Sequence, residues 1–204
     1  SLNNIVEAFL KNTITNHLKP YLLEKNPNDS RVFGNKGGGV YQGKVLDTLF
    51  CDFVMRKIRI YETQLREKNK SPANSIHENA ILARDIGIVN YVEDLVNCNL
   101  LHSLHSLFPR SARTHFDSLH SYIVRYRDDM DIGLDYHIDD SVVTINLCLN
   151  DGFLGSDLIF EGIRCPIHVD TPNKPNEQIM VKHEKGCMVL HDGKNRHYVK
   201  RLER

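Results

Sequence analysis

The stretch "DYHIDDSVVTINLCLN", residues 135–150, carries the strongest fold signal in the chain. Residues 142–150 are rich in β-branched and apolar side chains and end at Asn150, which predicts a strand that enters a core. Just before that strand, His137 and Asp139 stand two positions apart. Because positions i and i+2 of a strand point to the same face, this imidazole and this carboxylate can converge on one ion. The segment therefore predicts both a β-rich core and a candidate metal site.

Further strands are expected on either side of this segment. Short β-branched runs bounded by Gly, Asn, Asp or Pro occupy residues 120–126, 157–162, 177–184 and 186–193. Their spacing favours an antiparallel barrel or jelly roll over alternating strand–helix units.

The first half of the chain has a helical pattern. Apolar residues recur at helical spacing in residues 3–19, 45–68 and 75–108, the last interrupted near Gly87. Residues 26–43 are dense in Asn, Gly and Pro and are expected to form a flexible loop. The glycines at positions 34–39 lack the Lys-Ser/Thr pair that a phosphate-binding loop requires. We therefore expect an α+β protein in which helical residues 1–118 support a β-rich core at 119–204, and we expect the two parts to form one compact unit.

Composition and charge exclude several classes of protein. Of the 204 residues, 41% are apolar and 25% are charged, as in ordinary globular chains. Lys and Arg number 26, as do Asp and Glu, so bulk charge predicts no nucleic-acid or membrane-surface partner. No apolar run is long enough to cross a membrane. The five cysteines show no C-x-x-C spacing, which favours neither a disulfide framework nor a cysteine zinc site and fits a reducing compartment such as the cytoplasm.

A metal site at His137 and Asp139 needs a third ligand. Two histidines near the end of the chain, His191 and His197, are both candidates. Two imidazoles and one carboxylate form the facial triad that leaves coordination positions open on non-haem iron(II). Another histidine pair, His102 and His105, alternates with leucine on a helical segment and is expected to lie on the surface.

Several motifs in the second half occur together and in a fixed order. His137-Ile138-Asp139 is followed by Thr144-Ile145-Asn146, then by "GSDLIF" at residues 155–160, and finally by Gly186, His191, Gly193-Lys194 and His197. This order resembles the catalytic domain of iron(II)- and 2-oxoglutarate-dependent dioxygenases, in particular the prolyl/lysyl hydroxylase branch and the 2-oxoglutarate and iron-dependent oxygenase domain-containing proteins. The resemblance implies a double-stranded β-helix (jelly roll) with the helical N-terminal half packed against it.

The resemblance also implies a role for each site residue. His137, Asp139 and His197 would be the catalytic iron ligands, and His191 would not be a ligand. Tyr126 and Asn146 match residues that face 2-oxoglutarate, and Arg204, or Arg201 as the alternative, would hold its distal carboxylate. Asp140 and Asp192 are candidates to accept a hydrogen bond from a ligand imidazole.

The function implied by the resemblance is hydroxylation of a side chain in a protein or peptide, with 2-oxoglutarate converted to succinate. Iron(II) and 2-oxoglutarate would be required, with ascorbate as a supporting reductant. Two alternatives remain open from the residues alone: a non-catalytic metal-binding scaffold of the same fold, and a cupin-like metalloenzyme that uses no 2-oxo acid. The sequence leaves the substrate and the oligomeric state undetermined.

Overall fold

The computed structural model describes residues 25–68, 80–112, 116–126 and 133–203. The helical elements of the described residues are the 3₁₀ turn η2 (Ser30–Val32), α2 (Thr48–Glu67), α3 (Val89–Asp94), the π-helical segment η3 (Leu95–Leu100), α4 (Leu101–Leu107) and the 3₁₀ turn η4 (Pro166–His168). The strands are β1 (Gly34–Gly37), β2 (Val40–Lys44), β3 (Ile81–Leu82), β4 (Tyr122–Ile123), β5 (Leu134–His137), β6 (Val143–Leu147), β7 (Leu154–Gly155), β8 (Leu158–Ile163), β9 (Ile179–Val181), β10 (Cys187–Asp192), β11 (Asn195–Val199) and β12 (Leu202–Glu203).

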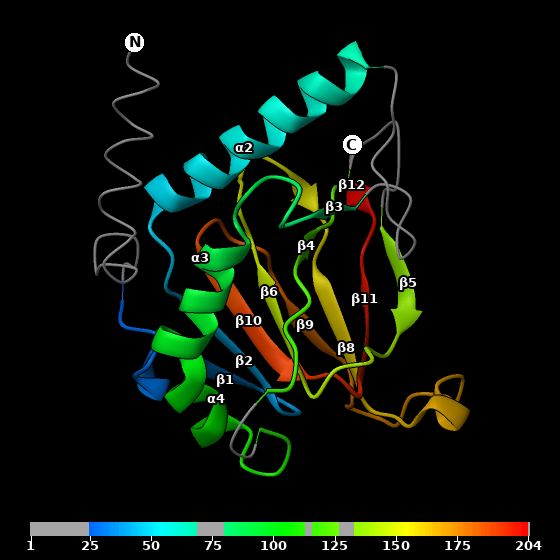
Figure 1. Cartoon of the computed structure of the whole chain (residues 1–204). Coiled ribbons are helices and arrows are strands. Elements are labelled where there is room, and N and C mark those ends of the chain that lie inside the picture. The colour runs from blue at the N-terminus through cyan, green and yellow to red at the C-terminus, as the bar shows by residue number, and fades with distance from the viewer. Residues whose placement is uncertain (1–24, 69–79, 113–115, 127–132, 204) are drawn as a thin grey trace.

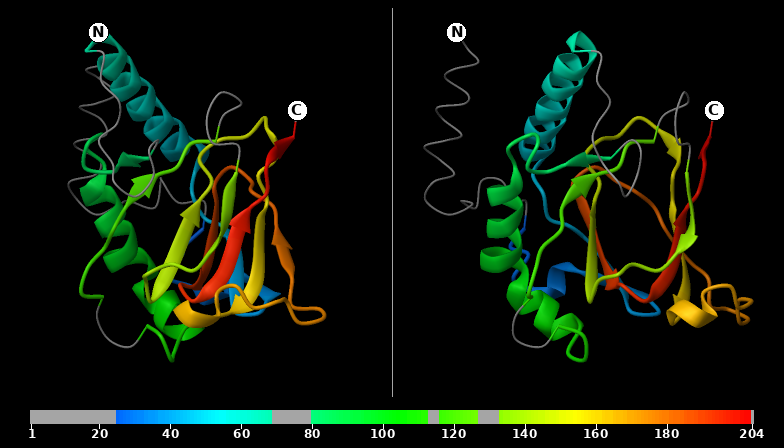
Figure 2. Two further views of the ribbon diagram at one scale, coloured as in Figure 1. Left: turned by 90° about the vertical axis from the view of Figure 1, so that its right-hand side faces the viewer. Right: turned by 45° about the vertical axis from the view of Figure 1, so that its right-hand side comes forward.

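Two antiparallel sheets form the centre of the molecule. One has the strand order β1-β2-β10-β6 and the other β5-β11-β8-β9, while β12-β7 and β3-β4 form small two-stranded sheets. The two larger sheets face each other (Figure 2). The α+β prediction is confirmed, and the paired antiparallel sheets are compatible with a jelly roll.

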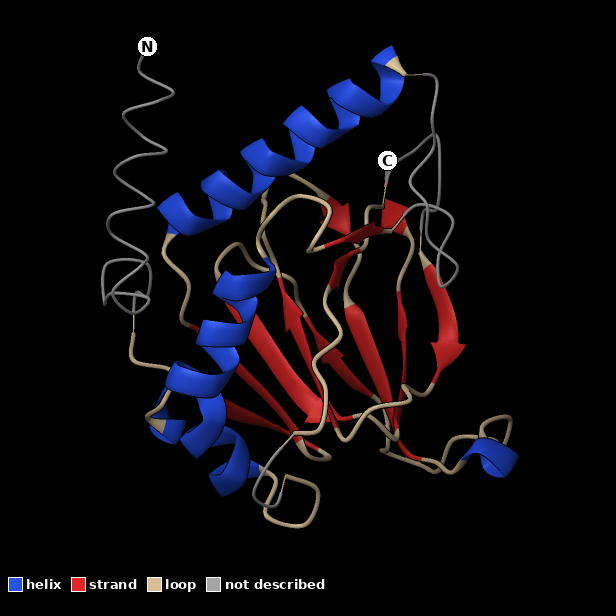
Figure 3. Cartoon of the chain, viewed as in Figure 1, coloured by secondary structure: helices blue, strands red, loops and turns tan. Residues whose placement is uncertain are grey.

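The helices cover the outer face of the sheet that contains β10 (Figures 1 and 3). Helix α2 begins at Thr48 and is capped by Asp47, whose carboxylate accepts a hydrogen bond from the amide of Leu49 at 2.7 Å. Its buried residues Phe50, Val54 and Ile58 recur at helical spacing and join one apolar cluster with Met188 and Leu190 of β10. The helical layer is thereby fixed to the sheet by apolar contact.

A second apolar cluster lies between the two sheets. It joins Val40 and Val189 of the first sheet to Leu158, Phe160 and Val199 of the second. Because side chains alternate along β10, Met188 and Leu190 face the helices while Val189 faces the second sheet. Both faces of β10 are therefore buried, which explains its nearly continuous apolar sequence.

The structure corrects the expected loop at residues 26–43. This segment contains the hairpin β1–β2, and β2 pairs antiparallel with β10 from Cys187↔Lys44 to His191↔Val40. Glycines weaken local strand propensity, so the pairing with a strand more than 140 positions away decides the structure here. The backbone of Gly37, Gly38 and Gly39 adopts positive φ at the turn, as glycine readily does.

The helical N-terminal half is not confirmed as expected. The helix expected in residues 3–19 lies outside the described residues. The helix expected at 45–68 is α2, whereas the segment expected to be helical at 75–108 contains β3 and becomes helical only from Val89. The interruption near Gly87 is confirmed by its positive φ of 69°.

No helix in the described part of the chain combines the length and apolar character that a membrane span requires.

Candidate metal centre

The two histidines expected as ligands lie side by side on neighbouring strands. His137 ends β5, and His197 lies directly opposite it in the antiparallel pairing of β11 with β5. Their ring centroids are 4.4 Å apart. Both imidazoles therefore project from the same place on the same face of one sheet.

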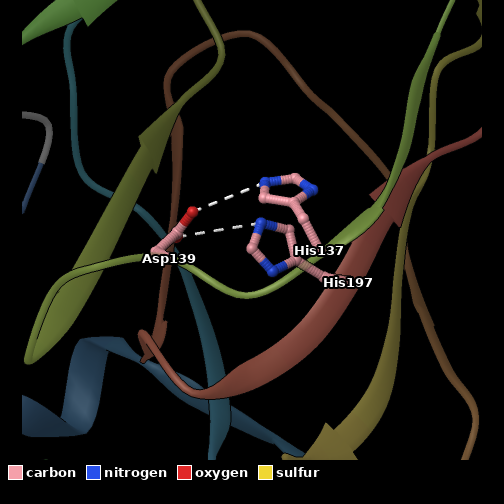
Figure 4. Close-up of side chains that lie close together, drawn as sticks. All are labelled: His137, Asp139 and His197. Carbon is pink, nitrogen blue, oxygen red and sulfur yellow. Dashed lines mark ion pairs between the residues drawn. The ribbon is translucent and has the colours of Figure 1, made fainter. Parts of the chain in front are cut away.

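Asp139 is held against this pair by the turn that joins β10 to β11. Its backbone amide donates to the carbonyl of Gly193 at 2.8 Å, and its carbonyl accepts from Lys194 Nζ at 3.0 Å. Its carboxylate oxygens lie 3.4 Å from Nε2 of His137 and 3.8 Å from Nε2 of His197 (Figure 4). The turn that leads into His197 thus also fixes the acidic residue.

The three side chains form a donor set that fits a metal ion. Their ligand atoms all lie within 4.8 Å of one another, and the described residues contain no other such group of three. The Nδ1 atoms of His137 and His197 lie 2.8 and 2.9 Å from the backbone carbonyls of Asp135 and Asn195. A carbonyl can only accept, so each Nδ1 carries a proton, and in the neutral ring each Nε2 keeps its lone pair. Both free lone pairs are on the nitrogens that face Asp139.

The electrostatics of the site favour an anionic Asp139. Burial raises the pKa of its carboxyl group, but the interaction with the His137 imidazole and the hydrogen bond from Thr144 outweigh burial and bring the pKa below its ordinary value. Burial lowers the pKa of His197, which favours the neutral ring. Burial also lowers the pKa of His137, but its contacts with Asp139 and the Asp135 carbonyl outweigh this and raise it overall. The negative charge of Asp139 thus attracts positive charge to the space between the rings.

His191 lies beside the three residues but is engaged elsewhere. Its side chain is fully buried, its Nδ1 lies 2.9 Å from the carbonyl of Asp192, and its Nε2 lies 3.1 Å from Nδ2 of Asn146. Its ring meets that of His197 edge to face at a centroid distance of 4.6 Å. Burial lowers its pKa to about 4. Asn146, the residue expected to face 2-oxoglutarate, therefore contacts a neutral imidazole next to a candidate ligand.

The other expected site residues have different placements. Tyr126 is partly buried against the apolar cluster between the sheets, and Arg204 lies outside the described residues. Asp192 accepts from Ser111 Oγ at 2.6 Å and Asp140 lies 3.9 Å from Lys194 Nζ. Backbone carbonyls rather than these carboxylates are thus the partners of the two ligand imidazoles.

Sequence reasoning missed two contributors to the site. Thr144 donates a hydrogen bond from Oγ1 to Asp139, and Lys194 holds the Asp139 carbonyl. Thr144 lies in the Thr-Ile-Asn motif and Lys194 in the Gly-Lys turn, so both motifs were visible without indicating these contacts.

Two histidines and a carboxylate next to a two-sheet β core form a donor set typical of proteins that bind a single iron(II). No family model matches the chain. It is 30% identical over 161 residues, 78% of its length, to the 2-oxoglutarate and iron-dependent oxygenase domain-containing protein ICU11 of Arabidopsis thaliana. It is 30% identical over 196 residues, 94% of its length, to the similarly named protein CP2 of that plant. The mouse 2-oxoglutarate and iron-dependent oxygenase domain-containing protein 2 is 25% identical over 159 residues, 78% of the chain.

The chain therefore belongs to the family of 2-oxoglutarate and iron-dependent oxygenase domain-containing proteins. The alignments cover 41%, 47% and 44% of these three relatives, so the chain spans less than half the length of each.

Proposed function

We propose that this chain is an iron(II)- and 2-oxoglutarate-dependent dioxygenase with a double-stranded β-helix fold. It hydroxylates a side chain of a protein or peptide and converts 2-oxoglutarate to succinate. The observation that carries the proposal is the meeting of His137, Asp139 and His197, with both free imidazole lone pairs facing the carboxylate. The names of the relatives support the same cofactor and co-substrate.

In this proposal His137, Asp139 and His197 hold iron(II), and Tyr126, Asn146 and Arg204 bind 2-oxoglutarate. Iron(II) held there supplies the O₂ chemistry, in which 2-oxoglutarate, O₂ and a substrate C–H group give succinate, CO₂ and an alcohol. Ascorbate would serve as a supporting reductant.

The chain's own residues would orient the donors and keep water out. The carbonyls of Asp135 and Asn195 fix the tautomer and direction of each imidazole. Phe160, which is fully buried, stacks on the His197 ring at a centroid distance of 5.6 Å. A rigid, partly dry donor set of this kind needs little rearrangement when a metal binds.

The proposed substrate class follows from the resemblance to prolyl and lysyl hydroxylases. The equal numbers of basic and acidic residues offer no bulk attraction to nucleic acid, which agrees with a protein or peptide substrate. We propose neither a nucleic-acid nor a membrane partner.

The test is release of succinate from 2-oxoglutarate in the presence of iron(II) and ascorbate. Wild type should release succinate, and His137→Ala should abolish the release because one metal ligand is lost. His120→Ala, a change of an exposed histidine, is the matched control and should behave like wild type. Metal binding that depends on His137 without succinate release would refute the dioxygenase and favour a metal-binding scaffold.

A further inference from the structure

Each candidate ligand histidine follows a residue that faces the opposite side of the sheet. Tyr136 precedes His137 and Arg196 precedes His197, and neighbouring residues of a strand point to opposite faces. The two are in contact there, with the Arg196 guanidinium carbon 5.5 Å from the centroid of the Tyr136 ring. The Tyr136 and Arg196 side chains therefore pack together on the face of the sheet opposite the two imidazoles.

Arg196 is covered by the segment that joins β8 to β9, residues 164–178, which we call the covering loop. The side chain is on the outer face of its sheet, yet Arg196 is only 4% exposed. Its Nη1 donates to the carbonyl of Val169 at 2.5 Å and to that of Thr171 at 2.7 Å, and its Nη2 donates to Asn173 Oδ1. One guanidinium thus fastens strand β11 to three positions of the loop.

The positive charge of Arg196 is balanced by a buried carboxylate. Glu161 of β8 is 3.1 Å from Arg196 Nη2, and its other oxygen accepts from Asn173 at 2.7 Å and Gln178 at 3.3 Å. Both terminal nitrogens of Arg196 and both oxygens of Glu161 thus have partners, whereas Nε of Arg196 has none among the described residues. Removal of either charged group would leave the other charge uncompensated. These contacts fix the positions of Arg196, Glu161 and the covering loop relative to one another.

A second arginine, Arg164 at the start of the covering loop, holds the loop together through a side chain that hydrogen-bonds to neither β5 nor β11; only its backbone amide donates to the Lys194 carbonyl, at 2.8 Å. Arg164 binds both carboxylate oxygens of Glu177, at 2.8 and 2.7 Å, and donates from Nε to Thr171 Oγ1 at 3.0 Å. Arg164 follows β8, whereas Arg196 lies within β11 next to His197. The chain thus offers two arginine anchors of one loop, only one of which adjoins a candidate ligand.

We propose that Arg196 is a positioning residue for the metal centre, acting through the backbone of β11. Arg196 stands between Asn195 and His197, and its bonds to the covering loop fix the backbone of both neighbours. The carbonyl of Asn195 in turn accepts from Nδ1 of His197 and so orients that ring. Tyr136 extends the same support to His137, because its hydroxyl donates to Asp170 of the loop at 3.1 Å. The covering loop thus supports the strand positions of both imidazoles from the opposite face of the sheet. This inference rests on the proposed metal site.

A consequence is reciprocal coupling between the metal and the covering loop. If the loop holds the ligands in the geometry that the metal requires, the bound metal must stabilise the loop by the same free energy. Metal binding is therefore expected to slow amide hydrogen exchange in residues 165–176.

The experiment compares Arg196→Met with Arg164→Met, using Co(II) alone as the probe and no 2-oxoglutarate. Both variants lose one anchor, so exchange in the covering loop should become faster in both. Arg196→Met should weaken Co(II) binding by about 10–100-fold, the range found when partners of metal ligands are removed. Arg164→Met should bind Co(II) like wild type and keep the metal-dependent protection of the loop.

Equal Co(II) affinity in wild type and Arg196→Met would overturn the proposal, as would an equal loss in both variants. Arg196→Lys serves if Arg196→Met does not fold. It keeps a positive charge opposite Glu161 but cannot reproduce the planar guanidinium contacts, so Co(II) affinity should still fall. The proposed function is judged separately. If succinate release depends on His137 but Arg196→Met binds Co(II) like wild type, only the positioning role is refuted. If the protein binds Co(II) but releases no succinate, only the dioxygenase proposal is refuted.

Discussion

Asp139 lies between the Nε2 atoms of two imidazoles and accepts a hydrogen bond from Thr144. A carboxylate in this position can neutralise part of the charge of a divalent ion, and the two rings cannot. The donor set therefore depends on this one negative charge more than on the shape of the side chain.

Asp139→Asn is accordingly expected to abolish tight metal binding with little change of fold. The amide has nearly the same shape but lacks the charge, so Co(II) affinity should fall by more than about 100-fold, beyond the range for partners of ligands. Titration with Co(II) measures this. Asp140→Asn changes an exposed neighbouring carboxylate and should bind as wild type does. Tight binding by Asp139→Asn would show that this residue is not a ligand.

Residue spacing predicted that His137 and Asp139 could meet but left His191 and His197 open as the third member. The resemblance to 2-oxoglutarate-dependent dioxygenases selected His197, and the structure brings this residue to the other two. The contacts that orient them could not be predicted, because two are backbone carbonyls, at Asp135 and Asn195, which every residue possesses. Side-chain patterns contain no information about which carbonyl will face a ring.

At the scale of elements, the turn between β10 and β11 links the ligands. Gly193 accepts the hydrogen bond from the Asp139 amide and leads into β11, which carries His197. A Cβ at Gly193 would overlap the backbone oxygen and the hydroxyl of Ser141, two residues after Asp139. The close approach of turn and ligand segment therefore requires glycine here.

Gly193→Ala should weaken both the fold and the metal site. Relief of the overlap must move the backbone at Ser141, which costs about 1–3 kcal/mol of unfolding free energy by analogy with overpacked cores. The same movement displaces Asp139, so Co(II) affinity should fall as well. Urea unfolding and Co(II) titration measure the two effects. Gly34→Ala is the control, because its added Cβ meets only Gln42 O at 3.7 Å, an ordinary contact. Unchanged values in Gly193→Ala would contradict a tight approach.

Elements with a strong local pattern were predictable, and those fixed by distant partners were not. The spacing of Phe50, Val54 and Ile58 indicated α2, and the β-branched run at 142–150 indicated β6. The hairpin β1–β2 was expected to be a loop, since its glycines carry no strand signal and β10 supplies its pairing. Strand β11 was not predicted, because Asn195 and Arg196 are polar and do not give a strand pattern. Both are buried by distant segments: Asn195 donates to the Gly38 carbonyl, and Arg196 donates to the covering loop.

At the scale of the whole molecule, the apolar clusters lie in the layered core, whereas the buried ionic contacts lie at the covering loop. The helices and the sheet with β10 share one apolar cluster, and the two sheets share another. The covering loop is held instead by the pairs Arg196–Glu161 and Arg164–Glu177. Stability against acid should therefore depend on ionic contacts in this loop, while the layered core contributes at every pH.

The pair Arg164–Glu177 gives this expectation a definite sign. Hydrogen bonds from Arg164 and from the Lys174 amide hold the pKa of Glu177 at about 2, below its ordinary 4.5. Between these values the unfolded chain binds a proton that the folded chain does not, so the free energy of unfolding falls as the pH decreases. The contribution of Glu177 is complete above about pH 4.5 and is lost toward about pH 2.

Glu177→Gln isolates this contribution, because glutamine forms hydrogen bonds but does not titrate in this range. The variant should be less stable than wild type near neutral pH, and the difference should shrink steadily as the pH falls below about 4.5. Urea unfolding at a series of pH values measures it, and the titration of Asp139 cancels in the comparison because both proteins contain it. Glu203→Gln, which alters an exposed pair with Lys200, should show a difference from wild type that is small throughout. A wild-type advantage over Glu177→Gln that stays constant through the acid range would mean that Arg164 does not stabilise the charged form of Glu177.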